Sequence, residues 1–279
     1  MAFEATGRGF ESLRARLTRF VGASYEVAPL PSASARVPRR NSHPLRGFQS
    51  FRAQRAPATF EAPEIYGRRA IAQIVRALPL VERAYSRVRF SILRPKLLSV
   101  MDLMLTDQGR ILDVGCGFGL FAAYFGQTQP RRRITGVDPN PRRIRLARRV
   151  ADRLGMRQHT FVVGDVRDAV LEGPFDAAYV LDVMHHLPAD DQWRVLERLR
   201  SLIVPGGMLL LKDITTEPRL GLLFTEALDR LMVGWDEPLS YRHHREWAQM
   251  LTSLGFAVRM VRVPDILPYP HVVIAATKV

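Results

Sequence analysis

Short apolar segments alternate with amphipathic stretches from residue 109 to the end of the 279-residue chain, and this alternation most constrains the fold. Short apolar runs are typical of buried strands, and apolar residues that recur every three or four positions are typical of helices. Helix-like stretches separate the first five strands, which predicts a parallel sheet with helices on both sides. The expected strands are Ile111–Val114, Ile134–Val137, Thr160–Val163, Ala177–Val180, Met208–Leu211, Ala257–Val263 and His271–Ala276.

The last two of these strands are joined only by a short segment from Pro264 to Pro270. That segment is too short for a helical crossover, so the two strands should be antiparallel neighbours. The clearest helices are expected over Pro141–Leu154 and Asp190–Ile203, where apolar residues share one face. We therefore predict an α/β protein with a doubly wound, mostly parallel sheet of seven strands.

Residues 1–60 differ in composition from the rest of the chain. They contain ten arginines and three glutamates but no lysine or aspartate, and 27–57 is rich in Pro, Ser, Ala and Arg. This predicts a disordered basic tail, although an organellar transit peptide or a start codon assigned too far upstream stay open as alternatives. Residues 61–279 then form the domain, with helices over 61–108, divided at Pro79 and Pro95, and the strand-rich core over 109–279.

The composition excludes several classes of protein. Cys116 is the only cysteine, which excludes an internal disulfide framework and cysteine-based zinc sites. No apolar run approaches the ~18 residues of a membrane-spanning helix, and no secretory signal is evident, so we expect a cytoplasmic protein. The net charge of +14 comes from arginine throughout the chain and does not by itself predict a nucleic-acid partner.

A glycine-rich turn between a strand and a helix is the strongest local signal, and it runs from Ile111 to Leu120. Glycines allow the backbone to approach a ligand closely and to adopt angles that other residues avoid. The spacing is G-x-G-x-G, and Leu120 stands where the dinucleotide fingerprint needs a small residue. Asp113, two residues before the first glycine, suits a ligand with a cationic ammonium or sulfonium group.

Two further strands also end in an acidic residue. Asp138 lies 23 residues beyond Gly115, close to the spacing at which an acid meets ribose hydroxyls. Asp165 and Val166 follow the third strand and suit the amino group and the ring face of an adenine. One acid at each of three successive strand ends predicts a site for a ligand with methionine, ribose and adenine parts.

These segments together resemble the class I S-adenosylmethionine-dependent methyltransferases, most closely the bacterial small-molecule type. The matching motifs are ILDVGCGFG, GVDPNP, VVGDV, FDAAYVLDVMHHL, LIVPGGMLLL and LGFAV…PYPHVVIAATK, in the family's order over residues 85–279. The resemblance implies strand order 3-2-1-4-5-7-6 with strand 7 antiparallel, and S-adenosyl-L-methionine as cofactor. The residues that it implies around the cofactor are Asp113, Gly115, Cys116, Gly117, Asp138, Pro139, Asp165, Val166 and Leu181.

The fourth strand continues into Leu181–Leu187, which the family's fold places beside the transferred methyl group. This segment lacks the Asn/Asp-Pro-Pro-Tyr/Phe of adenine-N6 and glutamine methyltransferases, and the chain has no Pro-Cys nucleophile for cytosine C5. His186 and His244 are candidate general bases. Packing and helix capping are the alternative roles for His186, and a solvated helix start is the alternative for His244. No metal site is predicted.

The acceptor is less defined by the sequence. An apolar stripe over 220–235 indicates core packing, a wall for an apolar acceptor, or a dimer or membrane-surface contact. We expect a small, apolar, lipid- or polyketide-like acceptor. An RNA or protein methyltransferase that uses the basic tail and the ten arginines of 131–157 stays as one alternative, and an inactive cofactor-binding protein as another. The oligomeric state is not predicted.

Overall fold

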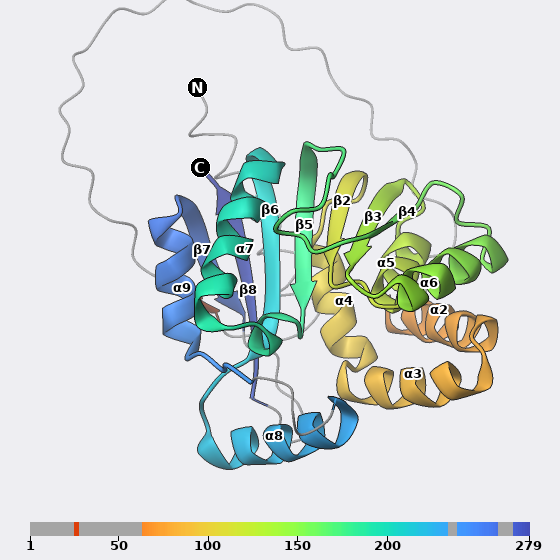
Figure 1. Ribbon diagram of the computed structural model, residues 1–279, viewed down its shortest axis with the longest axis horizontal. Helices are drawn as coiled ribbons and strands as arrows, with labels where there is room; N and C mark the ends of the chain where they lie inside the picture. The colour runs from red at the N-terminus through yellow and green to blue at the C-terminus, as the bar shows by residue number, and fades with distance from the viewer. Residues whose placement is uncertain (1–24, 28–62, 234–238, 262–269) are drawn as a thin grey trace, which may run out of the picture.

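The computed structural model describes residues 25–27, 63–233, 239–261 and 270–279. Within this part of the chain the strands form one sheet in the order β1-β7-β8-β6-β5-β2-β3-β4 (Figure 1). The strands are β1 (Tyr25–Val27), β2 (Gly109–Val114), β3 (Arg132–Asp138), β4 (Thr160–Val163), β5 (Phe175–Leu181), β6 (Ile203–Ile214), β7 (Phe256–Val261) and β8 (His271–Lys278). The helices are α2 (Pro63–Ala77), α3 (Leu80–Ile92), α4 (Pro95–Met104), α5 (Leu120–Thr128), α6 (Pro141–Arg153), the short 3-10 helix η1 (Met184–His186), α7 (Ala189–Leu202), α8 (Arg219–Val233) and α9 (His244–Ser253).

The seven predicted strands are all present, and without β1 their order is the expected 3-2-1-4-5-7-6. Strands β2 to β6 pair in parallel, whereas β8 is antiparallel to both of its neighbours, β6 and β7. The predicted antiparallel pairing of the last two strands is therefore confirmed. Most of the segment that joins them lies outside the described residues.

Two features of the sheet differ from expectation. No helix connects β4 to β5, because residues 164–174 form turns in which the Asp165 side chain accepts a hydrogen bond from the Arg167 amide at 2.9 Å. In addition, Tyr25–Val27 adds an eighth strand, antiparallel to β7. Apart from these three residues, the predicted tail over 1–60 lies outside the described residues, and the domain boundary at residue 61 remains a prediction.

The helices cover the sheet as two layers (Figure 1). One hydrophobic cluster joins one face of the sheet to α4, α5 and α6, with α2 packed outside α4 and α5. A second cluster joins the other face to α7 and α9. Helix α6 begins where Asn140 caps the amides of Arg142 and Arg143, and it buries Ile144 and Val150 against the sheet.

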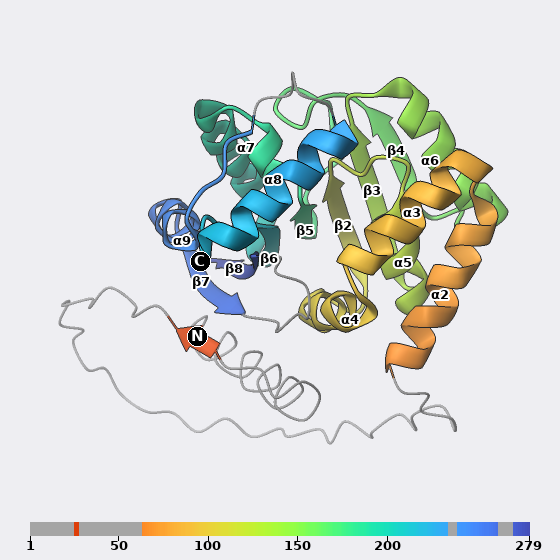
Figure 2. The ribbon, with the colours of Figure 1, turned by 90° about the horizontal axis from the view of Figure 1, so that it is seen from below.

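Helices α3 and α8 belong to neither layer. The three N-terminal helices are divided at Pro79 and Pro95, as predicted. In Figure 1, α3 and α8 lie beneath the carboxyl ends of the parallel strands, and Figure 2 looks onto that edge with both helices in front. The edge of the sheet that carries the predicted site residues is therefore the edge that these two helices border.

Candidate functional site

The glycine loop after β2 has a backbone that only glycines adopt easily. Gly115 and Gly117 have φ angles of 69° and 55°, in the left-handed region. A Cβ on Gly115 would lie 2.6 Å from the Val183 side chain, so the loop packs directly on the turn after β5. A Cβ on Gly117 would meet no atom within 4 Å, so the loop leaves open space there.

Asp113 lies at the end of β2 with only 2% of its surface exposed. Its Oδ2 atom accepts no hydrogen bond from the described residues. Burial raises the pKa of Asp113 to about 7, an effect that the nearby Tyr179 hydroxyl opposes and the Asp138 carboxylate reinforces. A buried carboxylate in this state suits a cationic group more than an anionic one.

Asp138 ends β3 beside the glycine loop. Its two carboxylate oxygens accept hydrogen bonds from the backbone amides of Gly117 at 3.0 Å and Asn140 at 2.8 Å. Pro139 follows it, and an open hollow of about 470 Å³ is lined by Pro139–Arg142. Asp138 thus links the loop to the adjacent hollow.

Asp165 follows β4, and Arg167 holds its carboxylate through two hydrogen bonds of 2.9 Å and 2.6 Å. This pairing is the main reason why the pKa of Asp165 lies below its ordinary value. Arg167 also pairs with Asp191 of α7 at 2.6 Å. Any ligand amino group at Asp165 would therefore share the carboxylate with Arg167. Val166 beside it is buried.

Two of the predicted cofactor residues turn their side chains into the protein. The thiol of Cys116 is buried, and it approaches Gly136 of β3 so closely that a Cβ there would lie 2.8 Å from the sulfur. Burial raises the pKa of this thiol. Leu181, at the end of β5, is also buried. Both residues would contribute to a ligand site through backbone and shape.

The two histidines of η1 have different surroundings. His185 is buried and its Nδ1 atom pairs with the Asp213 carboxylate at the end of β6. Asp213 also accepts the backbone amides of His185 at 3.2 Å and Ile214 at 2.8 Å. The His186 ring lies 4.1 Å from the His185 ring and is partly exposed. Burial, followed by the charge of His185, lowers the pKa of His186 to about 4, so this imidazole is neutral at pH 7.

His244 is the first residue of α9. Its backbone amide donates to the Thr215 hydroxyl at 3.0 Å, and its Nδ1 atom lies 3.2 Å from the same hydroxyl. The neighbouring His243 caps the helix by accepting the Arg245 amide at 3.2 Å. His244 therefore helps to attach α9 to Thr215 at the end of β6.

A buried ionic network at the end of β5 did not emerge from the sequence. Asp182 pairs with the buried Lys212 and, at 2.8 Å, with Arg89 of α3. Burial disfavours the charged form of Asp182, but the two cations hold its pKa below its ordinary value. Asp182 also has a φ of 53°, in the left-handed region. A lysine that directly follows the apolar run Met208–Leu211 was the available signal, because a buried ammonium group needs a carboxylate partner.

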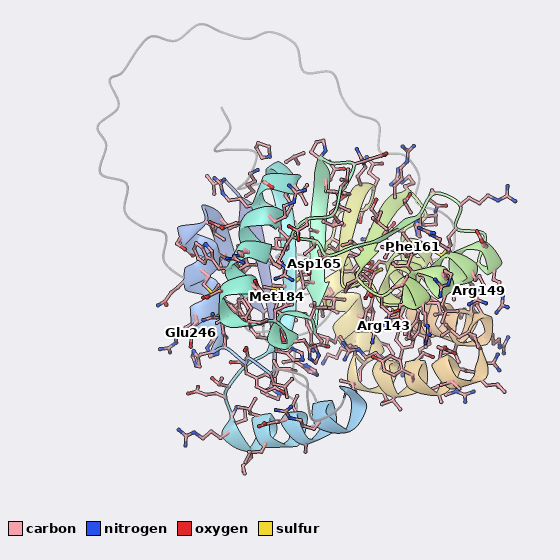
Figure 3. All side chains as sticks on the ribbon, viewed as in Figure 1. Arg143, Arg149, Phe161, Asp165, Met184 and Glu246 are labelled. Carbon is pink, nitrogen blue, oxygen red and sulfur yellow. The ribbon has the colours of Figure 1, made fainter. Side chains whose placement is uncertain are left out.

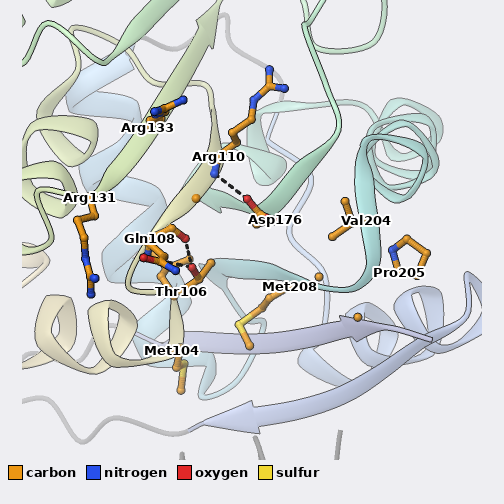
Figure 4. A pocket seen from close by; sticks show the side chains of 14 residues that line it. Met104, Thr106, Gln108, Arg110, Arg131, Arg133, Asp176, Val204, Pro205 and Met208 are labelled. Atoms are coloured by element: carbon orange, nitrogen blue, oxygen red, sulfur yellow. Dashed lines mark hydrogen bonds between the residues drawn. The ribbon is translucent and has the colours of Figure 1, made fainter. Parts of the chain in front are cut away.

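A separate cavity lies at the opposite edge of the sheet. It has a volume of about 780 Å³ and opens at the amino ends of the strands, where Arg110, Asp176 and Met208 line it (Figure 4). None of the predicted site residues lines this cavity. Among the described residues, no three His, Cys, Asp or Glu side chains gather as a metal site, and no helix there is long and apolar enough to cross a membrane.

The carboxyl edge of β2 to β6 therefore fits an adenosyl ligand with a cationic group. A buried carboxylate oxygen without a donor lies at the end of β2, open space lies over Gly117, and carboxylates stand at three strand ends. The strand order and the position of the site are those that the resemblance to class I S-adenosylmethionine-dependent methyltransferases implies. Residues 111–207 match the family model described as a methyltransferase domain.

Particular relatives agree with this assignment. The ubiquinone biosynthesis O-methyltransferase of Xanthomonas axonopodis pv. citri is 29% identical over 161 residues, which are 56% of this chain and 63% of that protein. The chain thus matches less than two thirds of this relative's length.

Solved structures share the fold. The S-adenosylmethionine-dependent methyltransferase SibL has a TM-score of 0.60 at 20% identity, covering 77% of this chain and 69% of SibL. The 1,6-didemethyltoxoflavin-N1-methyltransferase of Burkholderia thailandensis, solved with 1,6-didemethyltoxoflavin and S-adenosylhomocysteine, has a TM-score of 0.55 at 21% identity, covering 82% of this chain and 98% of that chain.

Proposed function

We propose that the chain binds S-adenosyl-L-methionine at the carboxyl edge of its sheet and transfers the methyl group to a small apolar acceptor in the cytoplasm. The observation that carries the proposal is the convergence of Asp113, the glycine loop and Asp138 at the ends of two adjacent parallel strands. Asp165 follows the next strand of the sheet. The spatial order of the three acids matches the order of methionine, ribose and adenine in the cofactor.

Each of the predicted cofactor residues would contact a different part of S-adenosyl-L-methionine. Asp113 would face the ammonium group, the open backbone at Gly117 would accommodate the methionine part, and Asp138 would accept hydrogen bonds from the ribose. Asp165 and Val166 would meet the adenine. The bound cofactor supplies an electrophilic methyl group, so the protein's main task is to align the acceptor with it.

We propose that His186 takes the proton from a hydroxyl group of the molecule that receives the methyl group. It is neutral at pH 7, and its turn packs directly against the cofactor loop through Val183. The Asp213 carboxylate would hold the His185 ring in place beside His186, as a carboxylate orients a histidine in other acid–base sites. A pKa of about 4 makes His186 a weak base, so alignment supplies the larger part of the catalysis.

Two observations support an apolar acceptor: the exposed leucines beside the carboxyl edge of the sheet, and the names of similar proteins. Helix α8, which lies beneath the strand ends (Figure 1), exposes Leu220 and Leu223. Several similar curated proteins are named ubiquinone biosynthesis O-methyltransferases. A quinol or phenol carrying an apolar group is therefore the acceptor class that we favour.

The basic surface gives less support to an RNA acceptor. Three arginines of 131–157 are bound within the protein: Arg132 pairs with Asp102, Arg148 donates to the Phe161 carbonyl, and Arg153 donates to the Ala77 carbonyl. Others, such as Arg149, are exposed on the outer face of α6 (Figure 3). The arginines that are bound within the protein leave fewer side chains for a polyanionic acceptor.

Calorimetry tests the proposal. S-adenosylmethionine and S-adenosylhomocysteine should bind with micromolar affinity, and Asp138→Ala should weaken both. The control is Asp152→Ala on the exposed face of α6, which should leave binding unchanged. Binding of NADH without a response to S-adenosylhomocysteine would refute the assignment. Mass spectrometry of host metabolites with and without the gene should then reveal the acceptor as a species heavier by one methylene group.

A further inference from the structure

Large apolar side chains are exposed mainly on two helices. Nine such residues are exposed in the described part of the chain, and six of them belong to α3 and α8. We call these six the apolar rim. They are Leu80, Val81, Tyr85, Val88, Leu220 and Leu223.

The rim residues on α3 form a continuous stripe. Val81, Tyr85 and Val88 follow helical spacing with Ala84 between them, and all four are exposed. The opposite face of α3 is already buried through Ser86 and Phe90. The stripe is therefore additional to the face that attaches the helix to the domain.

Helix α8 also has exposed apolar side chains on one side and buried residues on the other. Leu220 and Leu223 are 81% and 62% exposed, whereas Gly221 and Thr225 on the other side are buried. A single exposed leucine needs no explanation, but apolar side chains gathered on two helices at the same edge of the sheet indicate an interaction surface.

The apolar rim borders the proposed active site. Both helices lie at the carboxyl edge of the sheet (Figures 1 and 2). The Tyr85 ring contacts Phe118 of the glycine loop, with ring centroids 5.5 Å apart. From the same helix, Arg89 reaches Asp182 at the end of β5. The surface is thus continuous with the entrance of the site.

The surroundings of the rim on α3 are basic. Glu82 is the single acid between Leu80 and Lys96, and the same segment contains four arginines besides Lys96. Arg87 and Lys96 are exposed. Apolar side chains flanked by arginine and lysine are the pattern of helices that lie in the interface of an anionic membrane.

We propose that the apolar rim seats the protein on the surface of an anionic lipid bilayer, with the entrance of the active site facing the lipid. The apolar side chains enter the headgroup region and the basic residues meet lipid phosphates. The docking surface stands on the exposed residues alone. Its consequence for catalysis, that an apolar acceptor reaches the site from the bilayer, rests on the proposed function.

Vesicle sedimentation with the full chain tests the surface. The protein should sediment with phosphatidylglycerol vesicles and not with phosphatidylcholine vesicles, and added salt should weaken the binding. Val81→Glu and Leu220→Glu should each reduce binding about tenfold, because each removes an apolar anchor and adds a repulsive charge. The matched control is Val279→Glu, since Val279 and Val81 are both 79% exposed. Val279 follows β8 at the opposite edge of the sheet, where Thr277 pairs with Met208, so its binding should match the parent.

Three results would overturn the proposal. The first is no sedimentation with anionic vesicles, and the second is equal loss in Val279→Glu and Val81→Glu. The third is a dimer in solution that Val81→Glu converts to a monomer without any vesicle binding, which would make the rim a contact between two copies. Calorimetry with S-adenosylhomocysteine separates this proposal from the proposed function: a protein that binds vesicles but not this ligand would refute only the latter.

Discussion

Asp113 shows how a single residue can carry both a cost in stability and a role in binding. Its position at the end of a buried strand desolvates the carboxylate and raises its pKa to about 7 from an ordinary value of 3.8. Between these two values the folded protein holds a proton that the unfolded chain has released. Stability contributed by this residue is therefore complete below about 4 and is lost as the pH rises through 7.

Asp113→Asn should remove this pH dependence. Urea unfolding at pH 5 and pH 8 should show a smaller fall in the free energy of unfolding for the variant than for the parent. In the parent, the affinity for S-adenosylmethionine should rise about tenfold from pH 6 to pH 8, because the fraction of ionised Asp113 rises by about that factor. An equal rise in the variant would show that another group is responsible.

His186 is the second residue whose role a substitution can decide. His186→Ala should lower turnover by roughly 100-fold, the effect usual for loss of a general base, while calorimetry shows unchanged cofactor affinity. His243→Ala, a change at the α9 cap, serves as a control for a histidine of the same region. Full activity in His186→Ala would assign this ring to packing and leave alignment as the mechanism.

At the scale of elements, ion pairs at the end of β5 connect helix α3, strand β6 and the turn that contains η1. Asp182 connects Lys212 of β6 with Arg89 of α3, and the turn that follows places His185 against Asp213. Lys212 is fully buried, and burial lowers its pKa. Such a network fixes the orientation of α3 over the strand ends and would set the shape of the site entrance.

Asp182→Asn should destabilise the protein by about 3 kcal/mol, because it leaves a buried lysine without its carboxylate partner. Asparagine tolerates the left-handed backbone at this position, so the change tests charge and not strain. Denaturant unfolding gives the measurement. Adding Lys212→Met should recover part of the loss, and no recovery in the double variant would argue against the ion pair as the cause.

At the scale of the whole molecule, two observations bear on the N-terminal boundary. Helix α2 begins at Pro63 and packs on α4 and α5, whereas Tyr25–Val27 pairs only with β7 at the edge of the sheet. Strands β7, β8 and β6 separate β1 from β5, the nearest strand that carries a predicted cofactor residue.

A chain that starts at Glu61 should therefore fold and bind S-adenosylhomocysteine with the affinity of the full protein. Its melting temperature should fall only slightly, because a three-residue edge strand is lost. Circular dichroism and calorimetry would provide these values. Insolubility, or melting far below the parent, would place the first 60 residues within the folded domain and move the boundary.

Local patterns in the sequence determined the strands, most of the helices and the positions of the three carboxylates. Periodicity and glycine spacing depend only on nearby residues, so Asp113, Gly115 and Asp138 could be identified as a group from the sequence alone. The β4–β5 connection was predicted wrongly because Asp165 and Arg167 form a turn where a helix was expected.

The tertiary structure alone decided the pairings among distant residues. Lys212 and Asp182 are 30 positions apart, a distance that no local period reveals, and only their adjacent strands bring them together. The same holds for the partner of His185 and for the exposure of Leu220 and Leu223 on α8, because helical spacing is the same for a buried and an exposed face. The glycine loop and the strand-end carboxylates can be predicted from neighbouring residues in the sequence. The burial of a side chain and its hydrogen-bond or ionic partners depend on which segments the folded sheet places side by side.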